Sequence, residues 1–187
     1  MPGLKGSFFI AVVAGASAVM GWVAYRHYAH PASDRVVATQ LDAGVWVSEQ
    51  ITPQQLVSLR DQQFFAAVVD LRPDGEVKGQ PSSVEMAAAA AAARAGVAFS
   101  YVPVPHGTIP DEAVNAVQKV LANPARPVLL YCRSGRRAAR TWALAEASRP
   151  GGLDAAAIKR SVLAAGQPVA DLDHDIQARI AARPDRG

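Results

Sequence analysis

The residues around the only cysteine of the chain have the types and spacing of a loop that binds an anion and attacks it. Cys132 follows the apolar segment 128–131, and Ser134, Gly135 and Arg137 come within five positions after it. This order predicts a buried strand, a tight loop and a helix start, where inward N–H groups and the helix dipole favour a thiolate and an anion. Arg137 can donate two hydrogen bonds to a phosphate or sulfate, with Cys132 as the nucleophile.

Four neighbours of the cysteine are candidate substrate-binding residues. The Ser134 hydroxyl could stabilise the thiolate, and Gly135 allows a turn that brings N–H groups against the ligand. Arg133 and Arg136 flank the loop and could attract anionic substrates, although such arginines are usually solvated. We expect the thiol to be exposed and sensitive to oxidation. The structural alternative is a buried cysteine beside a basic surface turn.

Four segments of the chain carry a resemblance to a known family. They are residues 44–53, 69–76 and 101–104 and the cysteine loop. Together they resemble the phosphatase-like domain of the beta-lactamase-hydrolase-like family, within the cysteine-dependent, dual-specificity-like phosphatases. The resemblance implies an α/β fold and hydrolysis of phosphomonoesters through a thiophosphate intermediate on Cys132.

The length of the loop points to a different enzyme. Tyrosine and dual-specificity phosphatases have five residues between cysteine and arginine, whereas four separate Cys132 from Arg137, and the sixth place holds Ala138. Four is the spacing of single-domain rhodaneses, so a sulfurtransferase that carries a persulfide is the first alternative. The segment 150–154 opens an alanine-rich helix instead of the strand expected in a rhodanese, which favours the phosphatase-like fold. A module that binds anions or phosphoproteins with little catalysis is the second alternative.

The residue that protonates the leaving group departs from the pattern of the resembled phosphatases. In dual-specificity phosphatases an aspartate follows the strand equivalent to residues 101–104 by about two positions. Here that place holds His106, which can donate a proton near neutral pH. His106 is therefore a candidate catalytic acid.

Further candidates follow the neighbouring predicted strand, at the edge where parallel sheets bind ligands. Asp74 is a candidate acid or base there, although Asp74 and the glycine after it also make an ordinary turn. Arg72 is expected to face the anion site as a binding residue. Asp70 and Glu76 have structural and catalytic interpretations of equal weight, and Asp111 is weaker because it also starts a helix.

The pattern of the remaining chain predicts an α/β domain with a central, mostly parallel sheet covered by helices. The predicted strands are 45–47, 64–71, 97–104 and 127–131, and the predicted helices are 52–61, 82–96, 108–122, 136–148 and 154–165. Capping boxes at Thr52 and Ser82 mark two helix starts. The order of these elements brings the cysteine loop to one edge of the sheet.

The N-terminus has the composition of a membrane anchor. Residues 8–25 carry no charge and lie between Lys5 and Arg26. As a helix, they would be about 27 Å long, enough to span a bilayer core. The sidedness is open, and the alternative is a signal peptide cleaved near 16–18, which would release the protein to the periplasm. The predicted division is an anchor at 1–28, a linker at 29–43, a phosphatase-like domain at 44–175 and a tail at 176–187.

Charge and composition limit the partners. The formal net charge is +3, and residues 1–30 supply +2 of it, which gives no case for nucleic-acid binding. One cysteine allows no internal disulfide, and the histidines lack ligand spacing, so we expect no metal or cofactor. The expected partners are a phosphorylated small molecule or phosphoprotein and, through the N-terminal helix, a membrane; the oligomeric state is not predicted.

Overall fold

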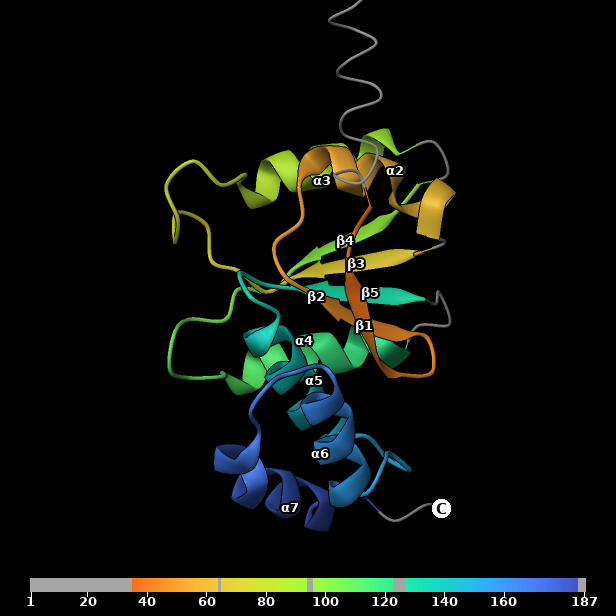
Figure 1. The fold of residues 1–187 in the computed structure, drawn as a ribbon. Helices are drawn as coiled ribbons and strands as arrows, with labels where there is room; N and C mark the ends of the chain where they lie inside the picture. Colours follow the sequence, from red (N-terminus) through yellow and green to blue (C-terminus); the bar gives the residue numbers. More distant parts are fainter. Residues whose placement is uncertain (1–34, 64, 94–95, 123–126, 185–187) are drawn as a thin grey trace, which may run out of the picture. The chain divides into compact units, whose positions relative to one another are not determined.

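The computed structural model describes residues 35–63, 65–93, 96–122 and 127–184, and within them five strands form one sheet (Figure 1). The strands are β1 (Ala38–Asp42), β2 (Val45–Ser48), β3 (Ala67–Asp70), β4 (Ala98–Tyr101) and β5 (Val128–Tyr131). Their order is β1-β2-β5-β3-β4, and only the pairing of β1 with β2 is antiparallel. The predicted mostly parallel sheet is confirmed, and β5 is its central strand.

Helices cover both faces of this sheet. They are α2 (Pro53–Gln63), α3 (Ser83–Ala92), α4 (Asp111–Ala122), α5 (Arg136–Ser148), α6 (Ala155–Ala164), the short 3-10 helix η1 (Ala170–Leu172) and α7 (Asp173–Ala181). Helices α2 and α3 lie on one face, α4 and α5 on the other, and α6 and α7 pack against α5 (Figure 1). The sheet therefore separates two hydrophobic cores.

The alternation of side chains along β5 decides where the cysteine lies. Val128 and Leu130 belong to the core under α4 and α5, whereas Leu129 and Tyr131 belong to the core under α2 and α3. This is the two-residue period of a strand. Cys132 continues the alternation and belongs to the core on the α5 side.

Local sequence signals account for the helix starts. Thr52 and Gln55 exchange side-chain and backbone hydrogen bonds at the start of α2, and Ser82 and Glu85 do the same at α3. These are the two predicted capping boxes, which satisfy N–H groups that a helix start leaves unpaired. Both predictions are confirmed.

Two predicted boundaries are wrong. Residues 38–42 of the predicted linker form β1, which pairs with β2. Residues 176–181 of the predicted tail belong to α7, because Ile176 is buried in the core and anchors the helix there. Arg183 fixes the following chain by donating to the carbonyl groups of Glu146, Ala147, Gly152 and Leu153.

The predicted anchor at 1–28 lies outside the described residues, so the structure does not test it. Within the described part of the chain, no helix is long and apolar enough to cross a membrane.

Candidate active site

The cysteine loop stands at the carboxyl end of the central strand. β5 ends at Tyr131, residues 132–135 form the loop, and α5 begins at Arg136. Because β3 and β4 run parallel to β5, the segments that follow them reach the same edge of the sheet. Cys132 itself is 0% exposed, so the expectation of an exposed thiol is wrong: the side chain continues the strand into the core beneath α5.

A cationic cavity of about 600 Å³ opens beside this loop. Its walls are Arg133, Ser134, Arg136 and Arg137 from the loop and α5, residues 105–109 after β4, and Arg140 and Asp171. Four arginines line it, and the two carboxylates paired with them, Asp171 with Arg140 and Glu76 with Arg137, leave an excess of positive charge suited to an anion. The structure thus brings five predicted site residues to the cavity wall, namely Arg133, Ser134, Arg136, Arg137 and His106. Cys132 lies directly before Arg133 in the chain but is not part of the wall.

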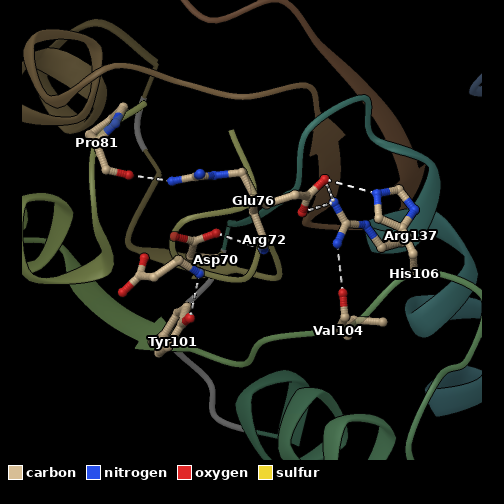
Figure 2. Close-up of polar contacts among 9 residues, drawn as sticks. Asp70, Arg72, Glu76, Pro81, Tyr101, Val104, His106 and Arg137 are labelled. Atoms are coloured by element: carbon tan, nitrogen blue, oxygen red, sulfur yellow. Dashed lines mark hydrogen bonds and ion pairs between the residues drawn. The ribbon is translucent and has the colours of Figure 1, made fainter. Parts of the chain in front are cut away.

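The Arg137 guanidinium is held by two groups from neighbouring segments. Its Nη1 donates to the Val104 carbonyl at 2.7 Å, and its Nη2 donates to both carboxylate oxygens of Glu76 at 2.8 and 2.6 Å (Figure 2). The Arg137 and Glu76 side chains are only 12% and 10% exposed. Among the described residues the Arg137 guanidinium makes no further hydrogen bond, so its Nε–H and one Nη1 N–H stay available for a ligand.

Glu76 also joins His106 to this arrangement. The His106 Nε2 lies 3.1 Å from Glu76 Oε1, while the imidazole itself is 74% exposed (Figure 2). Burial alone would raise the pKa of Glu76, but hydrogen bonds from Arg137 and His106 and their charges outweigh it and bring the pKa below its ordinary value. The carboxylate therefore stays ionised and links the guanidinium to the histidine.

The Asp74 carboxylate is bound to the start of α3. Its Oδ1 accepts a hydrogen bond from the Ser83 amide at 2.7 Å, and its Oδ2 accepts one from the Ser83 hydroxyl at 2.6 Å. Both carboxylate oxygens thus accept hydrogen bonds from the first residue of α3, and Asp74 does not line the cavity. The structure therefore places the predicted acid or base Asp74 at the start of α3 and away from the cavity wall.

Arg72 also points away from the cavity. Its guanidinium donates to the Pro81 carbonyl, and the residue is 1% exposed (Figure 2). Its backbone N–H donates to the buried Asp70 carboxylate at 2.9 Å. Burial raises the pKa of Asp70 against the opposing effect of this bond. The expectation that Arg72 faces the anion is therefore wrong, because it is packed inside the loop that joins β3 to α3.

Asp111, the remaining acidic candidate, forms an ion pair outside the cavity. Asp111 pairs with Arg179 of α7 and does not line the cavity. Asp171, which sequence reasoning did not consider, lines the cavity but accepts two hydrogen bonds from Arg140, each 2.6 Å long. No trio of histidine, cysteine or acidic side chains suited to a metal ion occurs in the described part of the chain.

Comparison with known proteins identifies the family. Residues 34–149, more than half of the chain, match the model of the beta-lactamase hydrolase-like protein, phosphatase-like domain. The chain belongs to this family. A beta-lactamase hydrolase-like protein of Xylella fastidiosa (strain Temecula1) is 40% identical over 82 residues, which are 44% of this chain. One of Agrobacterium fabrum is 36% identical over 85 residues, or 46% of this chain, and each match spans 19% of the relative's length.

Solved structures share the fold. The nma1982 protein of Neisseria meningitidis superposes with a TM-score of 0.58 at 24% identity, covering 75% of this chain and 96% of its own. The catalytic core of the PP-IP phosphatase SIW14 of S. cerevisiae gives 0.54 at 16% identity, covering 79% and 85%. Tk-PTP gives 0.56 at 18% identity, covering 79% and 97%. The phosphatase-like α/β fold implied by the resemblance is confirmed.

Proposed function

We propose that this protein is a cysteine-dependent phosphatase that hydrolyses phosphomonoesters. The observation that carries the proposal is the four-arginine cavity against the cysteine loop, with Arg137 held in place by Glu76. Such a site suits the charge of a phosphoryl group, which spreads over its oxygens in the transition state. The family match is consistent with this chemistry.

The reaction would proceed in two steps. The Cys132 thiolate attacks phosphorus, the ester P–O bond breaks, and the leaving oxygen takes a proton from His106. His106 then removes a proton from a water molecule that attacks phosphorus, so that the P–S bond breaks and inorganic phosphate and thiolate are released. The loop amides and Arg137 stabilise the charge on the non-bridging oxygens in both steps.

His106 fits the acid role by position. It lines the cavity, and its Nε2 faces the Glu76 carboxylate. Because a carboxylate only accepts hydrogen bonds, Nε2 carries the proton, and Nδ1 is left to exchange one with substrate or water.

Two features support other candidate functions. The four-residue spacing between Cys132 and Arg137 suits sulfane-sulfur transfer with a persulfide on the same sulfur. The full burial of Cys132 suits a module that binds anions or phosphoproteins without turnover. For the leading function, the substrates are phosphorylated small molecules or phosphoproteins, and residues 1–28 would anchor the protein to a membrane.

The test compares two reactions catalysed by the purified full chain. Phosphate release from an aryl phosphate and thiocyanate formation from thiosulfate and cyanide are measured for the wild type, Cys132→Ser and His106→Asn. His174→Asn is the matched control, since His174 is also an exposed histidine near a carboxylate but lies on α7. The proposal is supported if Cys132→Ser abolishes phosphate release and His106→Asn slows it, while His174→Asn leaves it unchanged. Thiocyanate formation alone, or silence in both assays, refutes it.

A further inference from the structure

Two carbonyl groups of the anion loop accept hydrogen bonds from outside the loop. The Gln50 backbone N–H donates to the Arg133 carbonyl at 3.4 Å, and the Gln167 side-chain Nε2 donates to the Ser134 carbonyl at 3.2 Å. A trans peptide directs its C=O and its N–H to opposite sides. These contacts therefore turn the N–H groups of the next residues in the loop, Ser134 and Gly135, away from the two glutamines.

Gln167 contacts the loop outside the cationic cavity. It lines a separate hollow of about 180 Å³ together with Ser48, Ser134 and Gly135, and it does not line the cationic cavity. Gly135 has a φ of +77°, and a Cβ there would lie 3.5 Å from the Gln167 Nε2. Because Gln167 holds the Ser134 carbonyl, the Gly135 N–H of the same peptide faces away from Gln167, and a loop N–H turned in this way can donate to an anion.

The chain that carries Gln167 is fixed at both ends. Helix α6 ends at Ala164, and Gly166 follows with a φ of +73°. The Gln167 N–H donates to the Val162 carbonyl at 3.1 Å, as in a Schellman cap. Beyond Gln167, Arg140 of α5 donates to the Pro168 carbonyl at 3.3 Å and pairs with Asp171. The amide of Gln167 is thus held against the loop by anchored backbone on either side.

We propose that Gln167 is a positioning residue that holds the Ser134–Gly135 peptide in the orientation needed for anion binding. The inference rests on the anion loop of the proposed function. Gln167 lies beyond residues 34–149 that match the family, so the support comes from the part of the chain that follows the matched domain.

The test is Gln167→Leu in the full chain, measured by calorimetric binding of inorganic phosphate and by kcat and KM for an aryl phosphate. Gln40→Leu is the matched control, because Gln40 also donates its Nε2 to a backbone carbonyl, that of Asp42, at 3.2 Å but far along the chain from the loop. Loss of one such bond is expected to weaken phosphate binding by about three- to tenfold in Gln167→Leu. The control should bind phosphate like the wild type and show the same small change in Tm.

The outcomes separate this inference from the proposed function. Wild-type phosphate affinity in both Gln167→Leu and the isosteric Gln167→Glu, which also lacks the donor, would overturn the positioning role alone. Phosphate binding without turnover in the wild type would overturn the hydrolase proposal and leave the Gln167 comparison intact. An absence of phosphate binding by the folded wild type would overturn both. If Gln167→Leu unfolds, Gln167→Glu provides the comparison.

Discussion

The contact between Glu76 and Arg137 makes a strong prediction about catalysis. In Glu76→Gln the side chain keeps its shape but loses its charge and one of its two acceptor oxygens. The two hydrogen bonds to Nη2, at 2.8 and 2.6 Å, join side chains that are almost fully shielded from solvent. A hydrogen bond to a charged group contributes about 1.5–3 kcal/mol, so we expect kcat/KM to fall by about 10- to 100-fold.

The assay is steady-state hydrolysis of an aryl phosphate at neutral pH, with phosphate affinity measured in parallel. If Glu76 holds Arg137 in place for the anion, both quantities fall, and Arg137→Lys falls at least as far because lysine cannot make the same directed contacts. If the carboxylate instead competes with phosphate for the guanidinium, Glu76→Gln binds phosphate more tightly and turns over faster. That increase, or no change, would refute the positioning role of Glu76.

The same pair predicts a dependence of stability on acid. Burial opposes ionisation of Glu76, but Arg137 more than compensates, so the folded-state pKa lies below the ordinary 4.5. The stabilisation is therefore complete above pH 4.5 and is lost as the pH falls through the lowered folded-state pKa. Urea unfolding should show a steeper acid loss for the wild type than for Glu76→Gln below pH 4.5, and parallel curves would contradict the pairing.

Three further variants test the structural assignments. Asp74→Ala should lower the free energy of unfolding by about 0.5–2 kcal/mol by removing the cap on Ser83, yet leave kcat unchanged; a large loss of kcat would restore Asp74 as a catalytic candidate. Burial raises the pKa of Asp70 above 3.8, so the free energy of unfolding should fall as the pH rises from 3.8 through the folded-state pKa and the carboxyl ionises. Urea unfolding of Asp70→Asn, which cannot ionise, should show no such fall. Gly135→Ala forces a Cβ into a backbone with φ +77°, which costs about 1–2 kcal/mol, and calorimetry should show weaker phosphate binding.

Local signals were enough to predict the elements that carry the cysteine. The capping residues Thr52 and Ser82 act within a few positions of the helices they start, and the continuous apolar segment before Cys132 is typical of a central parallel strand. β1 escaped prediction because only Leu41 of its five residues is buried, which leaves no alternating pattern. Its pairing with β2 is a tertiary property.

The arrangement of charged residues around the site could not be predicted from such local sequence signals. Glu76 and Arg137 are 61 positions apart, and no spacing rule joins them. Arg72 and Asp74 follow the correct strand, but sequence does not tell whether such side chains turn toward the cavity or toward α3. Here the Pro81 carbonyl and Ser83 provide partners on the α3 side.

The packing of α5 has a consequence for synthesis on the ribosome. α5 carries the end of the anion loop, and α6 and α7 cover it, with Arg183 fastening the chain near its C-terminal end. Translation proceeds at about 5–20 residues per second, so residues 150–183 emerge about 2–7 s after α5 is complete. Until each of them emerges, Ile158 and then Ile176 are missing from the core around Trp142. Nascent chains of this protein should therefore expose an apolar helix face to chaperones until the last turn of α7 has been made.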